Sequence, residues 1–186
     1  MRVREFLKMQ DPEQLAGLKA ITKYVVAKNC LGKKSTQKLT KYPFKKVEEL
    51  KELFSEGKII ELMCFLLSCN QRYILRRDYK EFVYFLRWIE KEFQNINRLE
   101  IELNRPKEGD EKMMMQLEQA GAESLNKFGI LNTIDSLANG DILKWGEVES
   151  LPYEMVYTKL LLNKEKAAVE RNYNQIIIEE NKGSNG

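Results

Sequence analysis

The chain has 186 residues, of which 43% are hydrophobic and 32% are charged, and its formal net charge is +3. It contains no histidine, which excludes Ser–His and Cys–His nucleophile pairs and histidine metal sites. We therefore expect no enzyme activity, no metal and no cofactor.

The three cysteines and the apolar segments indicate in which cellular compartment the protein functions. Cys30, Cys64 and Cys69 are odd in number and lack a metal-type spacing, which indicates free thiols in a reducing compartment. The first eight residues contain no apolar signal region. The longest apolar run, residues 59–67, is interrupted by Glu61 and is too short for a membrane span, so we expect no membrane association.

Positive charge is concentrated near the N-terminus. Residues 14–47 contain nine lysines and no acidic residue. One interpretation is an ordinary solvated face, and the other is a contact surface for DNA or for an acidic protein partner. The candidate contact residues under the second interpretation are Lys33, Lys34, Lys38, Lys41, Lys45 and Lys46.

Three helices are expected in the first 70 residues. Asp11 and Pro12 give a capped helix start, and the helix should run to about Asn29. A second helix should begin near Pro43 and end at Gly57, with residues 33–36 as an exposed polar connection before it. Residues 59–69 are apolar almost all round and should form the most buried helix of this part.

A long helix is predicted over residues 72–103. Its apolar positions alternate in steps of four and three over about four heptads. They are Leu75, Tyr79, Phe82, Leu86, Ile89, Phe93, Ile96 and Leu103, with Glu100 as the one interruption between the last two. Arg76, Arg77, Lys80 and Arg87 belong to a predicted solvated face. At 1.5 Å per residue the helix would be roughly 48 Å long, more than one small core covers, so it requires partners along its length.

The rest of the chain predicts shorter helices after a turn. Residues 104–110 carry a proline, a glycine and charges, which is a turn signal, and a helix beginning near Glu111 would fold back as an antiparallel hairpin. Its inward positions would be Met114, Leu117, Ala120 or Gly121, and Leu125. Short helices are expected over residues 130–138 and 142–145, and Pro152 begins the last helix.

These elements predict an all-α fold, a helical bundle with a long central helix in an antiparallel hairpin and short C-terminal helices. We divide the chain into a basic N-terminal part (1–70), a helical hairpin (71–127) and a C-terminal part (128–186), with one compact domain as the alternative. The carboxylates are scattered, and residues 32–36, Gly-Lys-Lys-Ser-Thr, lack the first glycine of a phosphate-binding loop. No catalytic residue is predicted.

One C-terminal stretch has a distinctive pattern. It reads Ile-Asp-Ser-Leu-Ala-Asn-Gly-Asp-Ile-Leu-Lys-Trp over residues 134–145 and continues to Leu151-Pro152-Tyr153. Over about residues 128–173 the chain resembles small helical proteins encoded among the virion-morphogenesis genes of bacteriophages, including tail assembly chaperones. There, too, a short helix with a tryptophan and a Leu-Pro step precede a final helix rich in lysine and glutamate.

The resemblance implies a non-enzymatic protein-interaction component of phage particle assembly, either a head–tail, neck or tail component or a tail assembly chaperone. Its partners would be other phage structural proteins and copies of itself, in the virion or the host cytoplasm, with DNA nearby. The candidate protein-interface residues are Leu75, Tyr79, Phe82, Trp145 and Tyr153. The alternative is a nucleic-acid-binding helical regulator that uses the lysine-rich segment.

Overall fold

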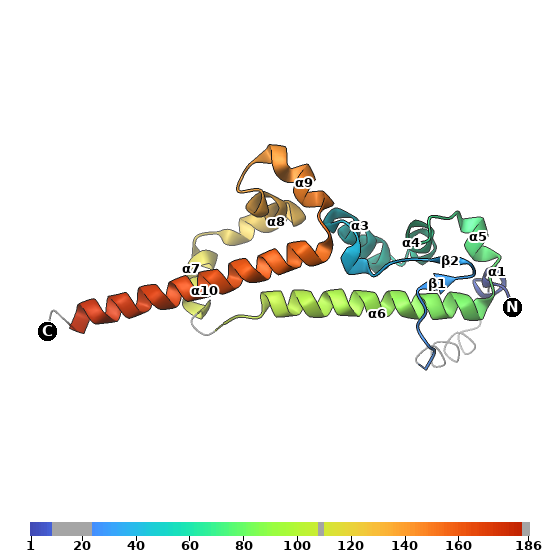
Figure 1. Ribbon diagram of the computed structural model, residues 1–186, viewed down its shortest axis with the longest axis horizontal. Coiled ribbons are helices and arrows are strands. Elements are labelled where there is room, and N and C mark those ends of the chain that lie inside the picture. The colour runs from blue at the N-terminus through green and yellow to red at the C-terminus, as the bar shows by residue number, and fades with distance from the viewer. Residues whose placement is uncertain (9–23, 108–109, 184–186) are drawn as a thin grey trace. The chain divides into compact units, whose positions relative to one another are not determined.

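The computed structural model describes residues 1–8, 24–107 and 110–183. The predicted all-α class is confirmed, with a long helix and several C-terminal helices, and the only sheet among the described residues has two short strands (Figure 1). The chain forms two compact units, Met1–Arg98 and Leu99–Gly186. The boundary between them lies inside the long helix and therefore differs from the predicted boundaries after residues 70 and 127.

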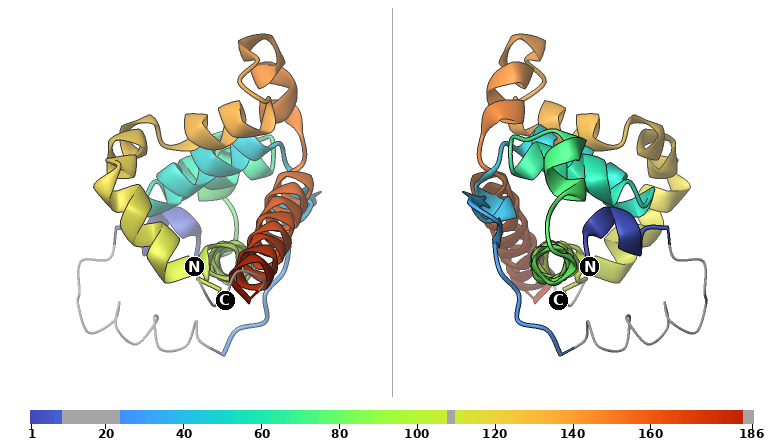
Figure 2. Two further views of the ribbon diagram at one scale, coloured as in Figure 1. Left: turned by 90° about the vertical axis from the view of Figure 1, so that its left-hand side faces the viewer. Right: turned by 90° about the vertical axis from the view of Figure 1, so that its right-hand side faces the viewer.

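Unit 1 is built around the N-terminal part of the long helix. Its elements are α1 (Val3–Phe6), β1 (Cys30–Leu31), β2 (Lys34–Ser35), the 3-10 turn η1 (Leu39–Lys41), α3 (Phe44–Ser55), α4 (Ile59–Leu66), α5 (Gln71–Leu75) and α6 (Tyr79–Asn104). Seen end-on, α6 has α3 and α4 on the same side (Figure 2). The rings of Phe54 and Phe93 stack between α3 and α6, with centroids 4.5 Å apart.

Glycine ends α3 at the predicted position. Gly57 has φ +72°, the left-handed conformation that a helix end of this kind requires. Its N–H donates to the carbonyl of Phe54, and the N–H of Lys58 donates to the carbonyl of Leu53. These two bonds satisfy carbonyls that the helix itself leaves open, so α4 can begin only two residues later.

The predicted helix over residues 72–103 is divided in two. α5 ends at Leu75, and Asp78 caps α6 by accepting a hydrogen bond from the N–H of Lys80 at 2.8 Å. The intervening turn pairs with the N-terminus, because Val3 N–H donates to the carbonyl of Arg77 and Arg2 forms a β-bridge with Asp78. Pairing with a distant segment, which periodicity cannot reveal, therefore breaks the helix.

The heptad stripe predicted for α6 faces the core of unit 1. Phe82, Ile89, Phe93 and Ile96 are buried, and the other positions of the stripe from Leu75 to Leu86 are half-buried. Val83 and Phe85, outside the predicted stripe, are buried as well. The buried face of α6 is therefore broader than the predicted stripe.

The prediction of a helix from Asp11 to about Asn29 is wrong for its C-terminal end. Residues 9–23 lie outside the described residues, and residues 24–29 are not helical. This segment contains a turn and bends, and the Lys28 N–H donates to the carbonyl of Tyr84 on α6. Residues 30–35, which include most of the predicted polar connection, form the antiparallel β1–β2 hairpin, with Leu31 fully buried.

Unit 2 consists of the end of α6 and the remaining helices. These are α7 (Asp110–Gln119), η2 (Ala122–Phe128), α8 (Ile130–Leu137), η3 (Ile142–Lys144), α9 (Trp145–Ser150) and α10 (Tyr153–Gly183). The prediction of an inward-facing apolar stripe on the helix that begins near Glu111 is wrong. Met114, Leu117 and Leu125 are about half exposed, at 55%, 48% and 52%, so these side chains do not form a buried seam.

The end of α6 is held by α10. The hydroxyl of Tyr153 donates to Glu100 at 2.7 Å, and that of Tyr157 donates to Glu102 at 3.2 Å. Lys164 Nζ donates to the carbonyl of Leu103 at 2.7 Å, and also to that of Arg105 at 2.5 Å. The contacts advance in the same direction along both segments, so α10 runs parallel to them, and Lys164 caps the last carbonyls of α6.

Replacing Phe82 by alanine tests the core of unit 1. Phe82 is 3% exposed, so the loss of its ring should lower the free energy of unfolding by about 3–5 kcal/mol. In a Trp145→Phe background, Trp88 fluorescence during denaturant unfolding reports unit 1 alone. Gln94→Ala, at an exposed site of α6, should change stability by less than about 0.5 kcal/mol. Equal stability of the two variants would contradict this core.

Candidate functional site

The six candidate lysines have different surroundings. Lys33, Lys38, Lys41 and Lys45 are exposed. Lys46 is half-buried, pairs with Glu49 at 2.6 Å and lies 5.5 Å from the ring centroid of Phe65. Lys34 is also half-buried, and it alone of the six lines a pocket of unit 1. The segment is therefore a mixture of solvated and internally bound lysines.

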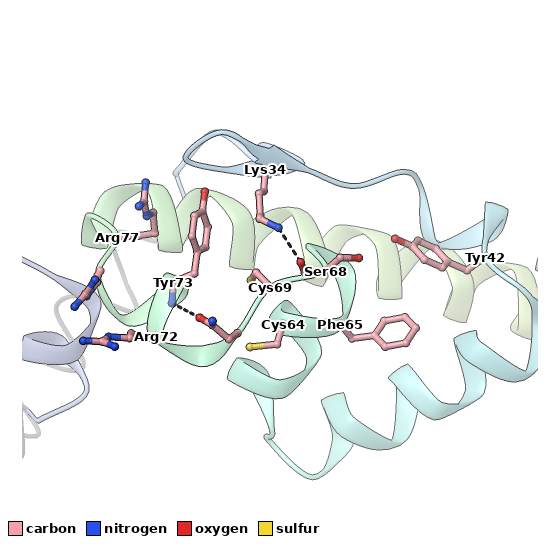
Figure 3. Close-up of a pocket in the computed structure, with 11 residues that line it drawn as sticks. Lys34, Tyr42, Cys64, Phe65, Ser68, Cys69, Arg72, Tyr73 and Arg77 are labelled. Atoms are coloured by element: carbon pink, nitrogen blue, oxygen red, sulfur yellow. Dashed lines mark hydrogen bonds between the residues drawn. The ribbon is translucent and has the colours of Figure 1, made fainter.

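An open pocket of about 960 Å³ lies in unit 1 (Figure 3). Four cationic and three aromatic side chains line it, together with two cysteines, and no carboxylate is among its lining residues. The cations are Lys34, Arg72, Arg76 and Arg77, and the aromatic residues are Tyr42, Phe65 and Tyr73. Its walls therefore combine uncompensated positive charge with apolar rings.

The end of α4 forms the floor of this pocket. Ser68 has φ +46°, and its N–H and that of Cys69 donate to the carbonyls of Phe65 and Cys64. Lys34 reaches across from β2, and its Nζ donates to the carbonyl of Ser68 at 2.7 Å and to that of Leu67 at 3.2 Å. A cation at a helix C-terminus is electrostatically favourable, so Lys34 stabilises the left-handed turn at Ser68.

Tyr73 and Arg77 form one wall. The Arg77 guanidinium carbon lies 4.3 Å from the Tyr73 ring centroid, and the Tyr73 hydroxyl donates to the carbonyl of Leu31 at 3.0 Å. Gly32, with φ +63°, makes room for both, because a Cβ there would lie 2.7 Å from Arg77 Nη1 and 2.8 Å from the Tyr73 hydroxyl. The β1–β2 turn thus fixes the orientation of this arginine.

The arginines of the pocket were missed by the sequence-based prediction, which placed Arg76 and Arg77 on a solvated face. Arg72 and Arg76 are exposed, and both line the pocket. Arg77 Nε is buried and has no hydrogen-bond partner within the described part of the chain. Three arginines within six residues next to a helix break were the available signal.

Cys64 and Cys69 lie beside each other in the pocket. Burial raises the pKa of the Cys64 thiol, and the nearby Cys69 raises it further. Burial also raises the pKa of Cys69, although Lys34 and the hydrogen bond with Cys64 act in the opposite direction. Both groups are therefore thiols rather than thiolates at neutral pH, and they are poor nucleophiles there.

The predicted interface residues form internal contacts instead. Phe82 and Tyr153 are buried, at 3% and 4% exposure, which corrects their assignment to a partner surface. Leu75 and Tyr79 are half-buried, and the Tyr79 ring lies 4.4 Å from that of Phe6. Trp145 is half-buried and its indole N–H donates to Asp135 at 3.2 Å, so this residue joins α9 to α8.

The helix α10 (Figure 1) carries a row of exposed apolar side chains. Four of its apolar side chains recur every seven residues, and a fifth completes the last heptad. They are Met155, Leu162, Val169, Tyr173 and Ile176, with exposed fractions of 54%, 46%, 66%, 62% and 53%. At 100° per residue, this outer stripe lies opposite the face that carries Tyr153, Val156 and Lys164 toward the rest of unit 2.

The described residues contain no group of three or more Cys, Asp or Glu side chains that could hold a metal ion. Within the same part of the chain, no helix combines the length and the apolar character needed to cross a membrane. Comparisons with known protein families, with curated proteins and with solved structures found no match.

Substitution of Gly32 tests the wall of the pocket. Gly32→Ala and Gly57→Ala both place a side chain at positive φ, which should cost about 1 kcal/mol or more in each case. Only at Gly32 does the new Cβ meet other atoms, so this variant should lose more free energy of unfolding than Gly57→Ala. Equal losses in denaturant unfolding would show that Arg77 and Tyr73 do not pack against the turn.

The pKa shifts of the two thiols predict their reactivity. At pH 8, Cys64 and Cys69 should react with iodoacetamide more slowly than a short cysteine peptide, with pH profiles displaced to higher pH. Unfolding restores the ordinary pKa, so the folded state binds protons more tightly and its stability should fall as the unfolded thiols ionise in the alkaline range. The alkylation rate of each cysteine is measured by mass spectrometry as a function of pH. A rate that rises at the same pH as that of the peptide, or at a lower pH, would contradict the burial of these thiols.

Proposed function

We propose that this chain is a non-enzymatic helical protein-interaction component of bacteriophage particle assembly, a head–tail or tail component or a tail assembly chaperone, and that it self-associates through the outer stripe of α10. The observation that carries the proposal is the second apolar face of α10, which unit 2 leaves exposed. The resemblance of residues 128–173 to phage morphogenesis proteins supports the biological setting.

The outer stripe has the spacing of a helix–helix seam. Its positions alternate in steps of four and three from residue 155 to residue 180. They are Met155, Lys159, Leu162, Lys166, Val169, Tyr173, Ile176 and Glu180. Every second position is apolar and exposed, so a helix of matching spacing can bury this stripe.

The charges on the stripe favour a second copy of this chain in antiparallel orientation. Lysines occupy stripe positions 159 and 166 in the N-terminal half, and Glu180 occupies the last stripe position, with Glu179 next to it in the sequence. Parallel copies would place lysine opposite lysine and glutamate opposite glutamate. Antiparallel copies instead bring the lysines of one helix toward the glutamates of the other.

The same arrangement suits a role in assembly. Self-complementary pairing of α10 joins two copies through a two-fold interface. Nothing in this role requires catalysis, since the stripe acts by burial of apolar surface alone. The proposal therefore predicts that the oligomer dissociates when the apolar residues of the stripe are replaced by charged ones.

Molar mass by light scattering tests self-association. The purified full chain should be a discrete oligomer with an even number of copies. Val169→Glu combined with Ile176→Glu places charges in the seam and should raise the dissociation constant by about two orders of magnitude or more.

The matched control is Asn174→Glu combined with Gln175→Glu, which adds the same charge to exposed residues of α10 away from the stripe. It should leave the oligomer intact. A monomeric wild-type chain, or equal dissociation of both double variants, would refute the proposed interface.

A further inference from the structure

The pocket of unit 1 has an electrostatic character that the proposed assembly role does not use. Its four cations have no carboxylate beside them in the lining, and Lys34 is already fixed by two carbonyls. Positive charges held together without a counter-charge repel one another, so an anion entering the pocket relieves this repulsion. The pocket is thus suited to a negatively charged ligand.

Two observations point to a phosphate group at the arginine end. Arg77 is held against Tyr73, and its buried Nε lacks a hydrogen-bond partner among the described residues. Arg72 and Arg76 provide further guanidinium donors from α5 and the turn that follows it. Guanidinium groups match the geometry of phosphate oxygens and bind them by paired hydrogen bonds.

The other end of the pocket is aromatic. Figure 3 shows Tyr42 and Phe65 on the side away from Arg72 and Arg77, with Lys34 and Ser68 between the two ends. Phe65 is 39% exposed, and its ring centroid lies 6.2 Å from that of Tyr42. An exposed aromatic ring near phosphate-binding cations offers a stacking surface for a nucleobase.

We propose that this pocket binds a nucleotide unit, either a free nucleotide or one within single-stranded nucleic acid, with its phosphate at the arginines and its base against Phe65. The volume of about 960 Å³ is within the range of pockets that hold ligands of this size. The site is independent of the α10 stripe, and only one of its cations, Lys34, belongs to the lysine-rich candidates.

Fluorescence anisotropy of a fluorescein-labelled oligothymidylate, titrated with the full chain, tests this proposal. Arg72→Gln combined with Arg76→Gln should weaken binding about tenfold or more and lower the salt dependence of log Kd by about one for each lost phosphate contact. Lys80→Gln combined with Lys91→Gln removes the same charge from exposed sites of α6 outside the pocket and should change Kd little.

The outcomes separate the sources of the ligand. Competition by thymidine monophosphate supports a site for a free nucleotide unit, and binding of the oligonucleotide without such competition supports a strand site. Absence of binding by the wild-type chain, or equal weakening by both double variants, overturns the proposal. Inorganic phosphate that competes as well as the nucleotide also overturns it, because the aromatic end would then contribute nothing.

The two pocket thiols provide a second readout. A saturating concentration of oligothymidylate should slow alkylation of Cys64 and Cys69 by N-ethylmaleimide, measured residue by residue by mass spectrometry. Cys30 does not line the pocket and serves as the internal reference. Equal rates with and without the oligonucleotide at all three cysteines would place any binding elsewhere and overturn the assignment.

Discussion

The long helix α6 is the element on which both units depend. Its residues from Phe82 to Ile96 form the centre of the unit 1 core, and its last turn, with Glu100 and Leu103, receives the contacts of α10 in unit 2. A helix of this length presents more surface than one small core can bury. In this chain, the N-terminal part of α6 contributes to unit 1 and its C-terminal end contributes to unit 2, so two units share the surface of the helix.

Helix ends in this protein are stabilised by lysines that are distant in sequence. Lys34 binds carbonyls at the end of α4, and Lys164 binds those at the end of α6. Each places a positive charge where the helix dipole is negative and satisfies carbonyls that lack a helical partner. Lys34 therefore already has a structural role in the pocket, which leaves the arginines of the pocket as the cations suited to a ligand.

The sequence predicted the features that local periodicity and local caps determine. The all-α class, the end of α3 at Gly57 and the buried stripe of α6 all follow from spacings within one helix. The break before Tyr79 depends on pairing with the distant residues Arg2 and Val3, which spacing within one segment cannot show. The same limit applies to the pocket, whose residues come from β2, α4 and α5 and meet only in the folded chain.

The most direct measurement of the central claim is a zero-length carbodiimide cross-link between Lys159 and Glu179 or Glu180. Within one straight helix these residues are about 30 Å apart, so such a bond can form only between two copies. Antiparallel pairing of the outer stripes predicts this cross-link in the wild-type oligomer and its loss in Val169→Glu combined with Ile176→Glu. A discrete oligomer without it, or with the link retained in that variant, would contradict the account.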